Sequence, residues 1–282
     1  PLNIGTRGSP LALAQAYETR ARLAQAFDLP HEAFEIVIIK VTGDLIQDRA
    51  LKDIGGKGLF TREIEEALLA GSIDIAVHSM KDMPVEQPGG LLLDTYLPRE
   101  DVRDAFVSLT CDGIADLAQG ATVGTSSLRR KAQLLARRPD LNVVEFRGNV
   151  QTRLKKLGDG VAEATFLAMA GLNRLGMDDV KRTAIAPEDM LPAIAQGAIG
   201  IERRGDDSRM AEMLAAKLRL LTLEREMSPS AVVLLCVPPP MVLTTVTAPP
   251  EPLTAGSEPA EDPPGPKAPG ARVAVELVAM VN

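Results

Sequence analysis

Apolar segments with two different spacings alternate along the chain, up to about residue 200. Continuous apolar runs predict buried strands, and apolar positions three or four residues apart predict helices. The expected strands are 34–41, 73–77, 105–109, 122–124 and 143–146, and the expected helices are 11–27, 61–70 and 128–137. This alternation is typical of α/β proteins, so the pattern predicts two α/β units in tandem.

The chain is expected to cross between the two units twice. Residues 98–103 mark the crossing into the second unit, and residues 191–197 mark the crossing back. A strand at 198–201 and a helix at 208–220 would then complete the first unit. We therefore expect a discontinuous domain 1 and an inserted domain 2, with the boundaries 1–97 and 198–218 for domain 1 and 98–197 for domain 2.

The C-terminal part has a different composition. Residues 229–282 contain 12 of the 21 prolines but only seven charged residues, and periodicity fades after Met227. We expect residues 219–282 to form a small third domain whose pattern is poorly legible. A frame-shift in the encoding segment would explain this composition, and so would a genuinely divergent or disordered end; the sequence leaves both open.

Two arginine pairs stand beside turns of small residues. A Gly-Thr-Ser-Ser turn opens a helix, so backbone N–H groups, hydroxyls and the positive end of the helix dipole meet Arg129 and Arg130. A second stretch adds Arg147 and Arg153. Because guanidinium groups beside such donors bind carboxylates and phosphates, the sequence predicts an anion site. A solvated arginine face is the alternative.

Further charged groups follow turns or strand ends. Near the N-terminus a short strand runs into a helix capped by Ser9, which places Arg7 beside exposed N–H groups. A glycine-rich loop presents Lys57, and Lys81 and Asp82 come directly after an apolar strand. In open α/β sheets the loops at the carboxyl ends of strands hold the ligand, so we expect these groups to converge on one cleft.

Composition restricts the possible classes of protein. The chain has 282 residues, 45% hydrophobic content and a net charge of −7, which allows two or three domains with apolar cores and argues against a nucleic-acid partner. We expect neither a membrane span nor a secretory signal, because long apolar runs are missing. Two cysteines, Cys111 and Cys236, imply no disulfide framework. The expectation is a cytoplasmic, monomeric enzyme without a metal ion.

Each motif also has a plainer structural interpretation. The Gly-Gly-Lys-Gly segment can be a surface turn, and Thr-Ser-Ser before a helix can be only a cap. His78 is expected to be a satisfied residue at a strand end, because no partner for catalysis or metal binding stands at a useful spacing. A two-lobed module that binds a small anion would need only one or two cationic anchors. A phosphoryl-transfer enzyme would need a full phosphate loop, which residues 55–59 do not spell.

Taken together, the motifs resemble one family, porphobilinogen deaminase, also called hydroxymethylbilane synthase. Nine hallmark segments occur in order between about residues 3 and 203. They read TRGSPLALAQA, VTGD, IGGKGLF, AVHSMKDMP, PREDVRDAF, GTSSLRR, FRGNVQTRL, LAMAGLNRLG and LPAIAQGAIGIE.

The resemblance implies a fold and a reaction. The fold is α/β, with two lobes like those of type II periplasmic binding proteins, two hinge strands, an active site between the lobes and a small C-terminal α+β domain. The reaction is a transferase step of tetrapyrrole (haem and chlorophyll) biosynthesis: four porphobilinogen molecules condense into the linear tetrapyrrole hydroxymethylbilane, and ammonia leaves at each addition. Each pyrrole brings an acetate and a propionate, which explains the many Arg and Lys motifs.

Residue roles also follow from the resemblance. Asp82 would be the catalytic carboxylate, which faces the pyrrole nitrogens and stabilises a cationic azafulvene-like intermediate. Cofactor binding is assigned to Cys236, Arg7, Ser9, Lys57, Ser79, Lys81, Thr125, Ser126, Ser127, Arg129, Arg130, Arg147 and Gly148. Substrate binding is assigned to Arg7, Ser9, Arg147, Arg153 and Gln196. For Gln196, a hinge role alone is the alternative.

The cofactor implied by the resemblance is dipyrromethane, held through a thioether bond by a cysteine in a loop reading roughly Leu-x-Gly-Gly-Cys-x-x-Pro-Ile. Cys236 is the expected attachment, and Pro239 has the expected offset, but Leu234 and Leu235 replace the glycines. Cys111 is expected to be structural. Because the glycines are missing, we expect residues 1 to about 217 to fold while the purified protein carries little or no dipyrromethane. A family member inactivated by its C-terminal segment is therefore an alternative.

Overall fold

The structure is a computed structural model that describes residues 1–45 and 58–215. Lys57, Cys236 and the expected third domain lie outside the described residues. Within the described ranges, no helix is long and apolar enough to cross a membrane.

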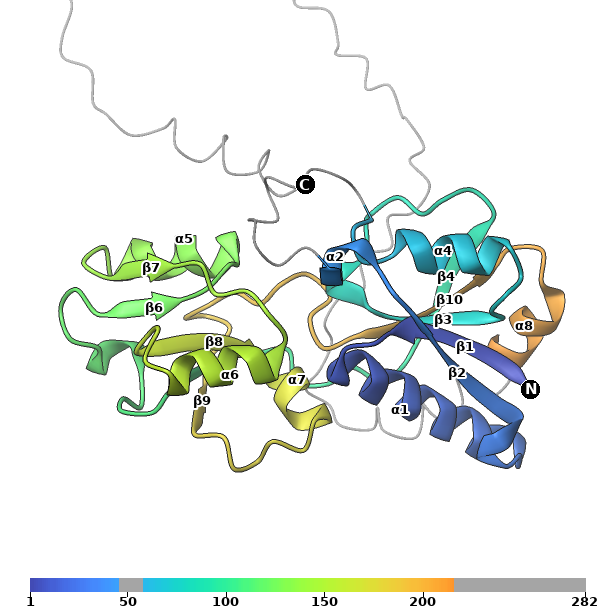
Figure 1. Cartoon of the computed structure of the whole chain (residues 1–282), viewed down its shortest axis with the longest axis horizontal. Helices are drawn as coiled ribbons and strands as arrows, with labels where there is room; N and C mark the ends of the chain where they lie inside the picture. The colour runs from blue at the N-terminus through green and yellow to red at the C-terminus, as the bar shows by residue number, and fades with distance from the viewer. Residues whose placement is uncertain (46–57, 216–282) are drawn as a thin grey trace, which may run out of the picture. The chain divides into compact units, whose positions relative to one another are not determined.

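The first lobe is built on a five-stranded mixed sheet (Figure 1). The strands are β1 (Leu2–Arg7), β2 (Phe34–Ile39), β3 (Ile75–Ser79), β4 (Leu91–Tyr96) and β10 (Ile199–Arg204), in the order β2-β1-β3-β10-β4. β1 runs parallel to β2 and β3, whereas β10 is antiparallel to β3 and β4. The chain therefore returns from the second lobe to complete the first sheet.

Helices cover both faces of this sheet. They are α1 (Pro10–Phe27), α2 (Thr42–Leu45), α4 (Arg62–Leu69) and α8 (Ser208–Met213). Leu23 of α1 packs with Ile4, Ile75 and Met210 on one face. On the other face, α4 contributes Ile64 and Leu68 to a second cluster of fully buried side chains. Each such Leu or Ile contributes about 1.5–3 kcal/mol through burial, so the two faces fix α1 and α4 relative to the strand ends.

The second lobe repeats the plan with a second five-stranded sheet. Its strands are β5 (Asp104–Ser108), β6 (Thr122–Gly124), β7 (Asn142–Val144), β8 (Ala164–Ala168) and β9 (Arg182–Ala184), in the order β7-β6-β8-β5-β9. Its helices are α5 (Leu128–Arg137), α6 (Val150–Gly158) and α7 (Met169–Arg174). β5 is antiparallel to its neighbours β8 and β9, while β6 is parallel to β7 and β8.

Successive residues of β5 face opposite sides of this sheet, as a pleated strand requires. Phe106 packs with Leu134 of α5, and its ring meets that of Phe166 edge to face with centroids 6.1 Å apart. Its neighbour Val107 packs with Leu157 of α6 on the other face. β5 is therefore buried on both sides, with α5 packed on one face and α6 on the other.

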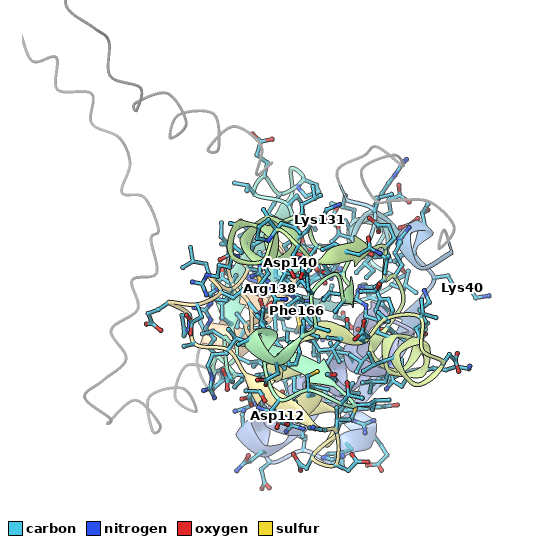
Figure 2. All side chains as sticks on the ribbon, turned by 90° about the vertical axis from the view of Figure 1, so that its left-hand side faces the viewer. Lys40, Asp112, Lys131, Arg138, Asp140 and Phe166 are labelled. Atoms are coloured by element: carbon cyan, nitrogen blue, oxygen red, sulfur yellow. The ribbon has the colours of Figure 1, made fainter. Side chains whose placement is uncertain are left out.

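The C-terminal end of α5 is held by an arginine with a structural role (Figure 2). Arg138 donates two hydrogen bonds of 2.8 Å to Asp140, and it also donates to the carbonyls of Ile114 and Leu117 at 2.9 and 3.0 Å. Its hydrogen bonds lower the pKa of Asp140 to about 2. Arg138 thus ties α5 to the lobe surface, unlike the arginines at the start of the same helix.

Two segments that cross between the lobes lie side by side. The amide of Leu97 donates to Ile199 O at 3.0 Å, and that of Glu100 donates to Gly197 O at 3.2 Å. Arg99 Nε adds a hydrogen bond of 2.9 Å to the carbonyl of Gln196. The expected fold class, two α/β lobes joined by two crossing segments, is confirmed. We propose that the domain boundaries lie in these segments, at about residues 98 and 197.

Gly197 is the tightest point of the crossing. Its φ of +89° favours glycine, and a Cβ there would lie 2.3 Å from the carbonyl oxygen of Glu100. Gly197→Ala is therefore expected to lower the free energy of unfolding by about 3 kcal/mol or more, through strain and clash together. The control is Gly176→Ala, which has a φ of +62° but meets no atom within 4 Å, so it should cost only about 1 kcal/mol. Equal losses in urea unfolding would contradict the clash.

Most predicted elements are confirmed within one or two residues. The strand expected at 143–146 instead ends at Val144, because the amide of Phe146 donates to Ser126 Oγ at 2.9 Å and leaves the ladder. The helix expected at 208–220 has its described turns at Ser208–Met213. The sequence pattern did not indicate β4, β8, β9, α6 or α7.

Candidate active site

A cavity of about 530 Å³ lies where the N-terminal end of α1, the end of β3 and the N-terminal ends of α5 and α6 meet. Both lobes contribute to its wall. Among its described lining residues, Asp82 is the one carboxylate, and six are cationic: Arg7, Lys40, Lys81, Arg130, Arg147 and Arg153. A cleft with this balance attracts anions, because charges of one sign along a concave surface focus the electric field there.

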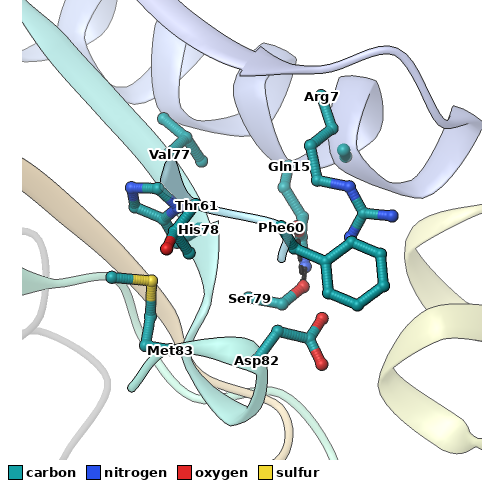
Figure 3. A pocket seen from close by; sticks show the side chains of 10 residues that line it. Arg7, Gln15, Phe60, Thr61, Val77, His78, Ser79, Asp82 and Met83 are labelled. Atoms are coloured by element: carbon teal, nitrogen blue, oxygen red, sulfur yellow. Dashed lines mark hydrogen bonds between the residues drawn. The ribbon is translucent and has the colours of Figure 1, made fainter. Parts of the chain in front are cut away.

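The first-lobe wall begins at the N-terminus of α1. Ser9 caps this helix, as expected, and its Oγ accepts a hydrogen bond from the amide of Ala12 at 3.3 Å. The Arg7 guanidinium lies over the Phe60 ring, with its carbon 4.3 Å from the ring centroid (Figure 3). Stacking on an aromatic face leaves the edge of a guanidinium able to donate to a ligand.

The end of β3 brings Ser79, Lys81 and Asp82 to the cleft. Lys81 and Asp82 lie in a 3-10 turn, Met80–Asp82, directly after the strand. The hydroxyl of Ser79 lies 2.8 Å from Nε2 and 3.0 Å from Oε1 of Gln15 on α1, which fixes the strand end against the helix (Figure 3). Asp82 and Ser79 also line a second, smaller cavity of about 20 Å³ behind this wall.

Lys81 is a cation in a crowded position. Lys81 is an exposed residue that lines the cleft together with Asp82, Arg130 and Arg153. Burial lowers the pKa of Lys81 below its ordinary value; Asp82 opposes this shift, and Arg130 adds to it. An anionic ligand would relieve this unfavourable burial of positive charge.

The lowered pKa of Lys81 gives an expected pH dependence. The protonated ammonium favours anion binding, and it loses its proton below pH 10.5, the ordinary lysine value. Affinity for porphobilinogen, the substrate that the resemblance implies, should therefore fall in calorimetry as the pH rises from neutral toward that value. Lys81→Arg should remove this fall because a guanidinium stays protonated, whereas Lys81→Met should have low affinity throughout. A parent affinity that is constant over this range would contradict the assignment.

Lys81 also affects folding, with the opposite sign. The unfolded chain binds its proton up to the ordinary pKa, whereas the folded chain releases it earlier. Between the lowered and the ordinary value the unfolded state holds more protons, so the contribution of Lys81 to stability rises with pH.

The hydroxyl residues before α5 build the turn itself. Thr125 Oγ1 accepts from the amide of Ser127 at 3.2 Å, and Ser127 Oγ caps the helix by accepting from the amide of Arg130 at 3.4 Å. Ser126 Oγ accepts from the amide of Phe146. Ser126 lines the cleft, whereas Thr125 and Ser127 do not. The proposed ligand roles of Thr125 and Ser127 therefore rest on the resemblance alone.

Arg129 and Arg130 share a carboxylate inside the protein. Arg129 Nη2 lies 2.7 Å from Oδ2 of Asp104, and Arg130 Nη2 lies 2.7 Å from Oδ1. Asp104 is fully buried at the start of β5. Burial raises the pKa of its carboxyl, but the two guanidinium groups outweigh that effect, so the pKa lies below the ordinary value. Arg130 also reaches the cleft, whereas Arg129 bonds the carbonyl of Leu191.

The second arginine pair flanks the N-terminus of α6. Asn149 caps this helix and accepts from the amide of Thr152 at 2.8 Å. Arg153 Nε donates to the carbonyl of Gly148 at 2.9 Å, and both Arg147 and Arg153 line the cleft. Burial lowers the pKa of Arg153 to about 10; Arg130 and Arg147 act in the same direction, and Asp82 opposes them. Arg153 is therefore a partly desolvated cation beside the candidate catalytic carboxylate.

Two residues named from the sequence have partners away from the cleft. Gln196 is buried, and its Nε2 donates to Val102 O at 2.8 Å and to Asp104 Oδ1 at 2.9 Å, which favours the hinge alternative. His78 is buried 2.9 Å from Glu202 Oε2, so its interpretation as a satisfied strand residue is confirmed. Cys111 is a half-buried free thiol that packs against the second-lobe core.

Sequence reasoning missed Gln15, Lys40 and Asp104. The signal for Asp104 was present, because a carboxylate that opens an apolar strand has to find a buried partner. Gln15 lies one helical turn or more beyond the cap of α1, on the face that carries apolar residues, and its polarity there was a usable signal. In the described ranges, no group of three or more His, Cys, Asp or Glu residues is arranged to hold a metal ion.

These features define a two-lobed α/β protein with a cation-lined cleft between its lobes. A family model described as "Porphobilinogen deaminase, dipyromethane cofactor binding domain" matches residues 2–212. The chain belongs to the porphobilinogen deaminase family.

Similar curated proteins carry the same name. The chain is 71% identical over 216 residues to porphobilinogen deaminase of Paracoccus denitrificans. This match covers 77% of the present chain and 69% of that protein. It is 60% identical over 218 residues to the chloroplastic enzyme of Pisum sativum, covering 76% and 59%. For the chloroplastic enzyme of Oryza sativa subsp. japonica the identity is 58% over 217 residues, covering 76% and 61%. The chain thus spans about three-fifths of the two plant relatives.

Solved structures with a similar fold include binding proteins. One is a probable amino-acid transporter binding protein from Bacillus subtilis, with a TM-score of 0.47 and 15% identity, covering 79% of this chain and 94% of that chain. Another is a substrate-binding domain of a putative amino-acid transporter from Streptococcus pneumoniae, with a TM-score of 0.48 and 16% identity, covering the same shares.

Proposed function

We propose that this protein is a hydroxymethylbilane synthase, which condenses four porphobilinogen molecules into hydroxymethylbilane and releases ammonia at each addition. The observation that carries this proposal is the cleft, which six cations from two lobes line together with the carboxylate of Asp82. Porphobilinogen presents two carboxylates per pyrrole, so a growing chain needs many cations. Its reacting ring becomes positively charged when the amine leaves, so it needs one anion.

The cations divide between the two lobes. Arg7, Ser9 and Lys81 would bind substrate or cofactor carboxylates from the first lobe. Arg147 and Arg153 would bind them from the second, with Arg130 between its buried partner Asp104 and the cleft. Charge-assisted hydrogen bonds of this kind are roughly twice as strong as neutral ones, and arginine can make them in pairs. The proposed roles of Lys57 and Cys236 concern residues outside the described ranges.

Asp82 would act on the reacting ring. Its carboxylate lies at the end of β3, where Ser79 and Lys81 also line the cleft. A carboxylate already present on the cleft wall stabilises the ring as positive charge develops on it. Among the described lining residues, Asp82 is also the one carboxylate that could accept or donate a proton during the reaction.

The residues present fit the dipyrromethane cofactor. The group carries several carboxylates, and the cation-lined cleft with Ser9, Ser79, Ser126 and the backbone at Gly148 offers donors for them. When bound, dipyrromethane supplies the pyrrole carbon to which the first substrate is joined. We propose Cys236 as the attachment residue of the cofactor. We also propose that the protein is monomeric and cytoplasmic; a chain with only two cysteines agrees with a reducing compartment.

Two measurements test the proposed function. Intact-mass analysis and an acid aldehyde reagent for dipyrroles should report little dipyrromethane in the purified parent, and the fraction that is loaded should carry the adduct on Cys236. The leucines before this cysteine are expected to limit loading, so Leu234→Gly with Leu235→Gly should raise the loaded fraction. Loaded protein should consume porphobilinogen. A loaded protein that binds porphobilinogen without consuming it would favour the small-anion binding module instead.

A further inference from the structure

Two consecutive residues of the returning segment, Gln196 and Gly197, are hydrogen-bonded to the outgoing segment and to the start of β5. The buried side chain of Gln196 donates to the carbonyl of Val102 at 2.8 Å and to Asp104 Oδ1 at 2.9 Å. The carbonyl of the next residue, Gly197, accepts from the amide of Glu100 at 3.2 Å. The side chain thus connects the returning segment with both the outgoing segment and the first residue of β5.

The same point of the segment is also connected with the first lobe. Arg174 Nη2 donates to Gly197 O at 3.0 Å, and its Nε donates to Glu18 Oε2 on α1 at 3.2 Å. Arg174 belongs to α7 of the second lobe, so this guanidinium links both lobes and the segment between them. A change in the relative position of the lobes has to move or break these contacts.

Asp104 carries the connection onward to the cleft. Its Oδ1 is shared by Gln196 Nε2 at 2.9 Å and Arg130 Nη2 at 2.7 Å, so one oxygen atom touches both the crossing segment and a cleft cation. Arg130 is held further by a hydrogen bond of 2.7 Å to the carbonyl of Phe166. Because Asp104 and the carbonyl of Phe166 both accept hydrogen bonds from Arg130, its guanidinium plane cannot rotate without weakening one of them.

We propose that Asp104 is a positioning residue that couples the returning segment to Arg130 through Gln196, so that the geometry between the lobes sets the carboxylate affinity of the cleft. Asp104 itself is fully buried and does not line the cleft. This inference rests on the proposed function, because it names a regulator of the same anion site. Its physical basis is that Gln196, Asp104 and Arg130 form one buried network, in which a displacement of one member changes the geometry of the next.

A purely structural ion pair is the competing explanation, and Gln196 separates the two. Gln196→Met keeps a long side chain and leaves both salt bridges of Asp104 intact, but it removes the amide that ties Asp104 to the segment. If Asp104 only neutralises Arg129 and Arg130, this change lowers stability and leaves ligand affinity unchanged. If Asp104 positions Arg130, affinity falls as well.

The experiment compares three proteins by calorimetric titration with porphobilinogen and by thermal unfolding. Gln196→Met should weaken porphobilinogen binding about tenfold, the scale of one hydrogen bond to a charged group. The control is Thr165→Val, which removes a buried hydrogen bond of 2.8 Å to Gly124 O in the same lobe, between two residues that do not line the cleft. It should lower the melting temperature and leave affinity unchanged. Equal affinities of the Gln196 variant, the control and the parent would overturn the proposal.

Two further results keep the test decisive. Arg130→Lys combined with Gln196→Met should weaken binding less than the product of the single effects, because both changes act on one guanidinium site; independent effects would overturn the coupling. A crystal structure of Gln196→Met should also show the Arg130 guanidinium displaced from its position in the parent. A parent that fails to bind porphobilinogen would instead count against the proposed function, while an unmoved Arg130 would count against the coupling.

Discussion

Asp82→Asn is expected to lose about 100-fold or more in turnover while its fold and dipyrromethane content stay as in the parent. Asp82 is the one carboxylate among the described lining residues of the cleft, and it is an exposed residue in the turn after β3. An amide keeps its shape but not its charge. The loss should therefore appear in the chemical step and not in assembly.

Single-turnover ammonia release tests this expectation. Asp82→Glu keeps the charge but moves it by about one methylene group, so its rate should lie between those of the parent and the Asn variant. Glu86→Gln, on the exposed segment that follows, is a control for loss of one negative charge outside the cleft lining. An Asn variant within a few-fold of the parent would remove Asp82 from the mechanism.

Arg153→Leu is expected to weaken porphobilinogen binding by about 2 kcal/mol or more, with a much smaller effect on thermal stability. Arg153 donates to the backbone carbonyl of Gly148, and burial beside other cations already disfavours its charge. An anionic ligand relieves this cost, so the arginine contributes more to the complex than to the free protein. Arg153→Lys should restore part of the affinity, because an ammonium lacks the planar fork.

Arg130→Leu provides the matched comparison. It would leave Asp104 fully buried with one guanidinium fewer, so it should lower both binding and the free energy of unfolding, the latter by about 3 kcal/mol. The expected contrast is thus selective loss of binding for Arg153 and combined loss for Arg130. Equal losses of stability in the two variants would contradict the assignment of Arg153 to the ligand.

Local signals in the sequence predicted the parts of the site that depend on neighbours in the chain. Ser9 and Ser127 were identifiable as caps because a hydroxyl residue at that position accepts from an amide three residues on. The helix at Leu128–Arg137 follows from apolar spacing and its cap alone. The position of Lys81 and Asp82 after β3 follows from the length of one apolar run.

Long-range pairing was not accessible in the same way. Nothing near Asp104 in the sequence says that its partners are Arg130 and Gln196, because these contacts depend on how β5, α5 and the returning segment meet. The strand Arg182–Ala184 has only three residues and takes its structure from pairing with β5. Elements this short carry too little periodicity to be recognised alone.

The interpretation of the arginine motifs changed for the same reason. Sequence reasoning treated four arginines as one group of carboxylate clamps. In the structure Arg129 and Arg130 are paired with Asp104, whereas Arg147 and Arg153 flank the N-terminus of α6 at the cleft. Residue type and spacing identified the anion site, but only the three-dimensional contacts separate positioning pairs from ligand-facing cations.

The most direct test of the central claim is the stoichiometry of porphobilinogen consumption and ammonia release by protein whose dipyrromethane content has been established by intact mass. The parent should release one ammonia for each porphobilinogen consumed and accumulate hydroxymethylbilane, and Asp82→Asn with equal dipyrromethane content should do so about 100-fold more slowly. Loaded parent protein that leaves both porphobilinogen and ammonia concentrations unchanged would contradict the claim that this cation-lined cleft is the active site of a hydroxymethylbilane synthase.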